Sequence, residues 1–194
     1  MKNIHATTIA NEIILLYEQY GGSEYAGEKV TQLEHMVQAA RLAEQEGYDE
    51  EVILAAFLHD VGHICVSAQE ENAMDGWGIK DHEEVGADYL REKGFSKRLA
   101  RLVASHVEAK RYLTWKDPLY YEQLSEASKK TLEYQGGPML TDEAGAFEVH
   151  PLFSLIIKMR HWDDVAKIEH LEVGDLDKYR DMIVRHLEQH YSAV

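Results

Sequence analysis

The chain has little of several features that would place it in a particular class of protein. It has a single cysteine, Cys65, so it can form neither an internal disulfide nor a zinc site built from several thiolates. No stretch reaches the roughly 18 apolar residues of a transmembrane helix. The first residues, Met1 to Ala6, also lack the apolar core of a signal peptide. We therefore expect a cytoplasmic protein without a membrane partner.

Positive charge is also scarce. Twenty Lys and Arg residues stand against 35 Asp and Glu residues, and the formal net charge is −15. Such a surface repels nucleic acid and anionic lipid, and we therefore do not expect the protein to bind nucleic acid. A small anionic substrate can bind only where metal ions or a few placed cations reverse the local field.

The remaining composition is that of a globular protein. The chain has 194 residues, of which 45% are hydrophobic and 28% charged, enough for one domain, residues 1–194, with its own core. Apolar residues recur at helical spacing, and no sustained alternation of apolar and polar residues indicates a sheet. The sequence therefore predicts an all-α helical bundle.

Capping signals and breakers divide the chain into helices. Thr31 and Glu34 form a capping-box pattern, and Asp49 and Ser96 precede further apolar segments. Residues 52–58 are apolar on all sides and are expected in the middle of the bundle. Residues 66–80 have little periodicity and are expected to form a surface loop or lid. The expected helices cover about 7–20, 31–47, 49–58, 81–94, 96–110, 124–132, 152–163 and 176–187.

Several polar residues fall on helical faces that should be buried. Burial of imidazole and carboxylate groups is unfavourable unless they are paired or bound to metal. Together these groups suit Fe, Mn, Ni or Zn rather than Ca or Mg alone. Asp60, beside His59, can bridge two ions. The six candidate ligands are His35, His59, Asp60, His82, His106 and Asp163.

Each candidate also has an ordinary interpretation. A single core histidine is more often satisfied by a carbonyl or carboxylate than by a metal ion, and His82 lies in an acidic run at a helix start. Asp163 is four residues before Lys167, the spacing of a helical ion pair. His186 and His190 share that spacing and form a weaker candidate metal clip on a polar helix.

The segment His59-Asp60-Val61-Gly62-His63 resembles the HD-domain superfamily. The pattern of that superfamily is an early His, a His-Asp pair, further histidines and a late Asp, in the order of the six candidates above. Most members are phosphohydrolases, and a minority are mixed-valent di-iron oxygenases.

The finer pattern resembles that minority, in particular the 2-amino-1-hydroxyethylphosphonate dioxygenase (PhnZ) family, and more distantly myo-inositol oxygenase. The resemblance extends over nearly the whole chain except residues 66–80. Besides the His-Asp segment, it is carried by 25–28 (YAGE), 32–35 (QLEH), 106–113 (HVEAKRYL), Ser128, 135–137 (QGG) and 160–163 (RHWD).

The resemblance implies a role for each matching residue. Asp60 would bridge two iron ions, Tyr25 would occupy the open iron position until substrate arrives, and Glu28 would move with it to contact the substrate ammonium or His63. His35, His59, Asp60 and Asp163 would hold one iron, and His82 and His106 the other. Lys110, Ser128, Gln135 and Arg160 would line the substrate pocket.

The implied reaction is cleavage of the C–P bond of a 1-hydroxyphosphonate by O2. The amino substrate, 2-amino-1-hydroxyethylphosphonate, would give phosphate and glycine. Its N-trimethyl analogue would give glycine betaine and could be caged by Tyr25, Tyr112 or Trp115. Hydroxymethylphosphonate is a further possible substrate.

Two alternatives stay open. One is a metal-dependent phosphohydrolase that acts on a phosphoester or nucleotide with activated water. The other is a degenerate HD module that binds a ligand or partner without catalysis. Tyr25 and Glu28, ahead of the first histidine, favour the oxygenase.

Overall fold

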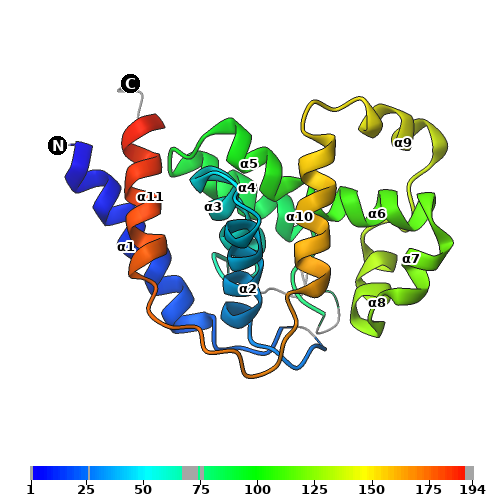
Figure 1. Ribbon diagram of the computed structural model, residues 1–194, viewed down its shortest axis with the longest axis horizontal. Coiled ribbons are helices and arrows are strands. Elements are labelled where there is room, and N and C mark those ends of the chain that lie inside the picture. Colours follow the sequence, from blue (N-terminus) through cyan, green and yellow to red (C-terminus); the bar gives the residue numbers. More distant parts are fainter. Residues whose placement is uncertain (1, 26, 67–73, 75–76, 191–194) are drawn as a thin grey trace.

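The computed structural model describes residues 2–25, 27–66, 74 and 77–190 (Figure 1). Within this part the chain forms eleven α-helices and one 3-10 helix, and it has no strand; an isolated bridge joins Glu24 and Thr31. The predicted all-α bundle is confirmed. In chain order the helices are α1 (Lys2–Tyr20), α2 (Gln32–Gln45), α3 (Glu50–Leu58), η1 (Val61–His63), α4 (His82–Glu92), α5 (Lys97–Ala104), α6 (His106–Lys116), α7 (Pro118–Gln123), α8 (Glu126–Tyr134), α9 (Thr141–Glu148), α10 (Phe153–Val165) and α11 (Asp177–His190).

Helix α3 lies at the centre of the bundle. All its residues from 52 to 58 are buried, and it packs against α2, α5, α10 and α11. Helices α1 and α11 run side by side at one end of the molecule, and α6 to α9 form the other end (Figure 1). The helix that is apolar on all sides is therefore enclosed, as its sequence predicts.

The capping signals act as expected at three helix starts. Thr31 and Glu34 form a complete capping box at α2, and the side chains of Asp49 and Ser96 accept the N–H groups of Val52 and Leu99. Each such cap contributes about 1 kcal/mol. Asp81 differs, because it precedes α4 in a left-handed conformation (φ 56°) and makes no side-chain cap.

The helix expected over residues 96–110 is two helices. Ser105 separates them: its hydroxyl donates to the Arg101 carbonyl at 2.5 Å and its N–H to the Leu102 carbonyl at 3.2 Å. These local bonds replace the regular helical pattern and bend the chain. As a result His106 is the first residue of α6 rather than a residue within a long helix.

Other differences lie outside the strongly periodic segments. Helices α7 and α9 were not expected, and α1 begins about a turn earlier than its apolar pattern indicates. Most of the lid expected at 66–80 lies outside the described residues.

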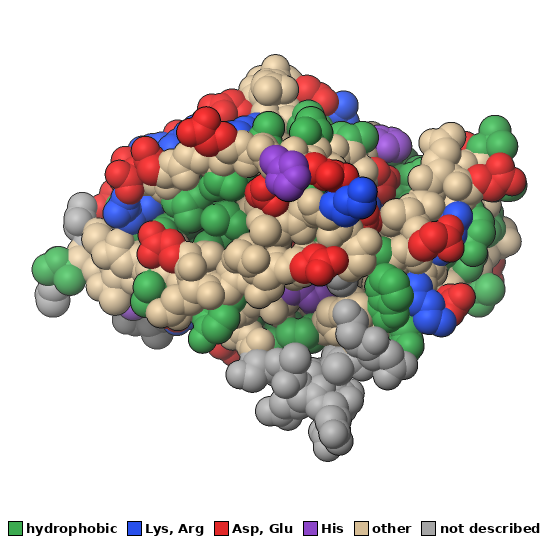
Figure 2. Space-filling view, turned by 90° about the horizontal axis from the view of Figure 1, so that it is seen from below, with side chains coloured by type: hydrophobic (Ala, Val, Ile, Leu, Met, Phe, Trp, Pro, Cys, Tyr) green, Lys and Arg blue, Asp and Glu red, His purple; other side chains and the backbone are tan. Residues whose placement is uncertain are grey.

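The surface is consistent with the charge of −15. Figure 2 shows Asp and Glu side chains spread over one face of the molecule. In the described part of the chain, no helix has the length and apolar character needed to cross a membrane.

Candidate metal centre and adjoining pocket

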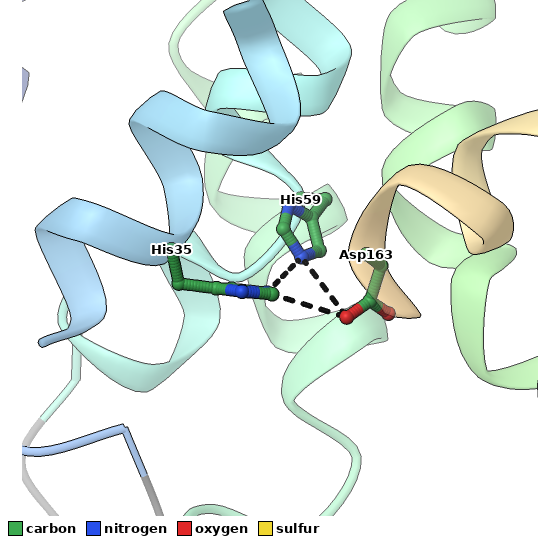
Figure 3. A group of neighbouring side chains, drawn as sticks. All are labelled: His35, His59 and Asp163. Atoms are coloured by element: carbon green, nitrogen blue, oxygen red, sulfur yellow. Dashed lines mark hydrogen bonds and ion pairs between the residues drawn. The ribbon is translucent and has the colours of Figure 1, made fainter. Parts of the chain in front are cut away.

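The first of two His/Asp groups joins three elements that are far apart in sequence. His35 comes from α2, His59 from the C-terminal cap of α3 and Asp163 from α10, and their side chains point toward one another (Figure 3). The Nε2 atoms of His35 and His59 are 3.1 Å apart, and Asp163 Oδ1 lies 3.3 Å from His35 Nε2. All three residues are buried.

The second group lies next to the first. His82, the first residue of α4, and His106, the first residue of α6, bring their Nε2 atoms to 2.9 Å. Asp60 Oδ1 is 3.3 Å from the first of these atoms and 3.2 Å from the second. This group is buried as well.

The Asp60 carboxylate connects the two groups. Its Oδ1 faces His82 and His106, whereas its Oδ2 lies 3.4 Å from His59 Nε2 and 3.7 Å from His35 Nε2. Each oxygen thus belongs to a different group. This is the arrangement of a carboxylate that can bridge two ions.

Backbone carbonyls determine the tautomer of all four histidines. Each Nδ1 lies 2.8 to 3.1 Å from a carbonyl oxygen, which can only accept a hydrogen bond. Nδ1 must therefore carry the proton, and in the neutral ring Nε2 presents a lone pair. The carbonyls are those of Ala166, Ala56, Ile79 and Val103, for His35, His59, His82 and His106 respectively.

The imidazole and carboxylate groups of this site fit two metal ions. Without cations, two pairs of imidazole lone pairs face each other, and both Asp60 oxygens are buried without a hydrogen-bond donor. Such an arrangement is unfavourable unless positive charge lies between the atoms. Two ligands bound at right angles, each about 2.1 Å from one ion, lie about 3.0 Å apart, close to the observed separations. Imidazole and carboxylate donors suit iron, manganese or zinc.

The charge of the two groups is consistent with this fit. Burial lowers the pKa of His59, but the Asp60 and Asp163 carboxylates raise it by more, to about 9. Burial opposes ionisation of Asp60, yet the surrounding imidazoles hold its pKa well below the usual value. The site therefore favours bound positive charge, and protons compete with metal ions for it.

Gly62 explains how His82 reaches Asp60. A Cβ atom at position 62 would lie 1.9 Å from the His82 carbonyl oxygen. The missing side chain lets η1 pack against the start of α4, and the ring of His63 stacks on that of His82 with centroids 3.9 Å apart.

A cavity of about 450 Å³, its open mouth included, adjoins both groups. All seven residues proposed from the resemblance line it, namely Tyr25, Glu28, His63, Lys110, Ser128, Gln135 and Arg160. Sequence reasoning missed Met74, Trp77, Val107, Ala127 and Thr131. Thr131 lies one turn after Ser128 on α8, a spacing that could have indicated it.

Two cations are buried at the cavity. Lys110 is 3% exposed and donates to Thr131 Oγ1 at 2.9 Å. Burial and the Arg160 guanidinium lower the pKa of Lys110 to about 7. Arg160 donates to Asp163 Oδ2 at 2.7 Å and to Asp164. It therefore orients a candidate ligand in addition to facing the cavity.

The polar side chains at the cavity differ in whether they already have hydrogen-bond partners within the protein. Gln135 Oε1 is buried without a partner, so it can accept a hydrogen bond from a ligand. Tyr25 stacks on His35 with ring centroids 4.1 Å apart. Desolvation and the nearby Asp60 and Asp163 carboxylates raise the pKa of Tyr25 well above its usual value, which keeps the phenol protonated.

Two further expectations concern residues near the site, an ion pair between Asp163 and Lys167 and an aromatic cage. Asp163 pairs with Arg160 rather than with Lys167, whose ammonium contacts Glu28. Tyr112 and Trp115 are not among the described residues that line the cavity. Tyr112 instead packs against Phe153 and donates a hydrogen bond to Glu148. Among the described residues, Tyr25 and Trp77 supply the Tyr and Trp side chains of the lining.

The histidine pair on α11, His186 and His190, lies near Glu51, but most of these side chains already have hydrogen-bond partners in the protein. The candidate ligand atoms of Glu51, His186 and His190 lie within 4.8 Å of one another. However, Glu51 accepts from Ser96 and Arg98, and His186 Nε2 accepts the Ser96 N–H at 3.2 Å. This group is already satisfied by the protein to a large extent.

The helical fold and the two buried His/Asp groups place this chain among the helical proteins that can bind metal ions in their core. A model of the HD domain family matches residues 33–144. The chain belongs to this family.

Three relatives match nearly the whole chain. An uncharacterized protein, L432, of Acanthamoeba polyphaga mimivirus is 48% identical over 92% of this chain and 82% of its own. The [1-hydroxy-2-(trimethylamino)ethyl]phosphonate dioxygenase (glycine-betaine-forming) of Leisingera caerulea is 40% identical over 92% of this chain and 90% of its own. The hydroxymethylphosphonate dioxygenase of Gimesia maris is 38% identical over 93% of this chain and 90% of its own.

Proposed function

We propose that this protein is a di-iron oxygenase that uses O2 to cleave the C–P bond of a 1-hydroxyphosphonate, releasing phosphate and a carboxylate. The observation that carries the proposal is the Asp60 carboxylate, whose two oxygens face two separate histidine pairs beside a cavity with buried cations. Two relatives named as dioxygenases of phosphonates support it.

Six side chains would hold the two ions. His35, His59, Asp60 and Asp163 would hold one, and His82 and His106, with Asp60 as the bridge, the other. When bound, iron supplies the redox chemistry with O2 that amino-acid side chains cannot perform. The chain's own contribution is to bind and orient the substrate and to keep water out.

The buried cations would bind the phosphonate. Burial and Arg160 lower the pKa of Lys110 to about 7. A bound phosphonate dianion would raise this pKa again, so that the amine would be an ammonium when substrate is present. Ser128 and Gln135 supply hydrogen bonds from α8 and its C-terminal cap. Because the rest of the surface is acidic, these groups make the cavity the favoured place for an anion.

Tyr25 would guard the first group. Its ring covers His35, and its protonated phenol can fill the open side of the site until substrate displaces it. This keeps water away from the reacting atoms. Glu28, on the same loop, would move with it.

Oxygen uptake by anaerobically purified, iron-loaded protein tests the proposal. The substrates are 2-amino-1-hydroxyethylphosphonate, its N-trimethyl analogue and hydroxymethylphosphonate, with phosphate release followed in parallel. We expect one O2 consumed for each phosphate released with at least one of them. Hydrolysis of phosphoesters without oxygen uptake would instead establish the phosphohydrolase alternative.

A further inference from the structure

Glu28 reaches the cavity with its carboxylate already neutralised. Its Oε1 accepts hydrogen bonds from Lys167 Nζ at 2.6 Å and from Ser125 Oγ at 2.5 Å. The side chains of Lys167 and Glu28 are only 20% and 14% exposed. An ion pair with so little solvent contact is screened much less than a surface pair.

Lys167 is held in place from both sides. The carbonyl of Ala166 accepts the Nδ1–H of His35 at 2.9 Å. The backbone of Ile168 exchanges two hydrogen bonds with the side chain of Gln38, at 2.9 and 3.0 Å. The turn after α10 is thus tied to α2 on either side of Lys167, and the ammonium is an internal feature of the site.

This pairing changes the charge that a ligand meets. Among the described residues that line the cavity, the carboxylates are Glu28 and Asp163, and Asp163 is engaged by Arg160 and His35. A cationic group on a substrate would therefore find no uncompensated carboxylate outside the candidate metal groups. It would have to displace Lys167 or lie beside it, and two positive charges next to the same carboxylate repel each other.

We propose that Lys167 is a specificity-determining residue: by supplying the cation for Glu28, it makes the cavity select 1-hydroxyphosphonates with an uncharged side chain over those with an ammonium group. This inference rests on the proposed function and narrows its substrate class. Lys167 acts through Glu28 and takes no part in the reaction itself.

Calorimetric binding to metal-loaded protein without oxygen tests this inference. The two ligands are 2-amino-1-hydroxyethylphosphonate and 1,2-dihydroxyethylphosphonate, in which a hydroxyl replaces the ammonium. The readout is the ratio of their Kd values, which a purely structural effect of the substitution would leave unchanged. Wild type is compared with Lys167→Met and Lys167→Gln, with Lys167→Arg as the conservative variant.

A matched control removes the same charge nearby. Lys29 follows Glu28 in the chain but is 82% exposed and lies 3.5 Å from Glu169. Lys29→Met therefore changes the net charge as Lys167→Met does, without freeing Glu28.

We expect wild type to bind the dihydroxy ligand at least as tightly as the amino ligand. Lys167→Met and Lys167→Gln should shift the Kd ratio by about tenfold toward the amino ligand, the effect of one charge-assisted hydrogen bond. Lys167→Arg and Lys29→Met should keep the wild-type ratio.

Two results would overturn the inference, and they differ in what else they overturn. If both ligands bind but the ratio is the same in wild type and in the Lys167 variants, Lys167 does not set specificity while the proposed function stands. If wild type binds neither ligand and consumes no O2 with any of the three hydroxyphosphonates, the proposed function and this inference are both wrong. If it binds neither ligand but consumes O2 with one of the three, only this inference is wrong.

Discussion

Arg160 and Asp163 form a buried ion pair in which Nη1 lies 2.7 Å from Oδ2, while the other carboxylate oxygen of Asp163 faces His35. Both residues are on α10, three positions apart. The pair leaves Oδ1 rather than Oδ2 facing His35. Under the proposed function, Arg160 would orient Asp163 in the way that outer-shell partners orient metal ligands.

Replacement of this arginine should therefore destabilise the fold and weaken metal binding. We expect Arg160→Gln to lower the free energy of unfolding by about 3 kcal/mol, because the substitution leaves a buried carboxylate without its partner. Iron per chain should fall as well. Urea unfolding and metal analysis measure the two effects.

Arg91 provides the matched control. It pairs with Asp88 at the same spacing, 2.5 Å apart, but both side chains are more than 40% exposed. Arg91→Gln should change the unfolding free energy by less than about 0.5 kcal/mol. Equal losses in the two variants would show that burial of the Arg160 pair is not what matters.

Under the proposed function, Asp60→Asn should affect both metal ions at once. The amide keeps the shape of the side chain but offers one oxygen, so it cannot bridge two positive ions as a carboxylate does. We expect this variant to retain little iron after desalting, and His106→Ala to lose mainly one of two ions. Metal analysis per chain, with circular dichroism as the folding control, distinguishes these outcomes. Wild-type iron content in Asp60→Asn would rule out the bridging role.

Gly62→Ala tests the close approach of η1 to α4. The added Cβ would lie 1.9 Å from the His82 carbonyl oxygen, so the start of α4 must move. We expect a loss of about 1 to 3 kcal/mol, as for overpacked cores, and weaker metal binding by His82. Thermal unfolding with and without iron measures both.

Gly145→Ala is the matched control for this glycine. Position 145 is within α9, and a Cβ there meets nothing within 4 Å. Its substitution should be neutral or stabilise the protein by up to about 1 kcal/mol, because alanine favours helix. If both variants behave alike, the packing explanation for Gly62 is incorrect.

His186 should make stability depend on pH. Burial and the neighbouring His190 lower the pKa of His186 from 6.5 to about 4. The unfolded chain then binds more protons than the folded one between these values. This contribution is fully present above about pH 6.5 and is lost as pH falls toward 4.

The size of this loss can be measured by urea unfolding at pH 7 and pH 5. We expect about 1 to 2 kcal/mol from this group, reduced from the full shift by partial solvent contact. His186→Gln keeps an acceptor for the Ser96 N–H but does not titrate, so the difference between the two pH values should shrink. His161→Gln removes an exposed histidine as a control. An unchanged pH dependence in His186→Gln would assign the effect to other groups.

The sequence predicted the bundle well where a signal is local. The Thr31 capping box, the apolar segment that ends at His59 and the stripe of α10 that carries Asp163 all appear in the structure. These signals depend on periodicity and on hydrogen bonds within one turn, so they can be found in the chain itself. The interruption at Ser105 and helix α9 were missed, because packing decides whether such weak segments continue or form.

By itself the sequence determined that imidazole and carboxylate groups are available, and in which order the six His and Asp residues follow one another. It also determined the acidic net charge, which disfavours anion binding except where cations are placed. The roles of the six residues as metal ligands stay a prediction. Only the tertiary structure decided that each Asp60 oxygen faces a different histidine pair, that Arg160 rather than Lys167 engages Asp163, and that Lys167 engages Glu28. Those contacts join residues up to 139 positions apart, and their geometry depends on how helices pack, which no local pattern encodes.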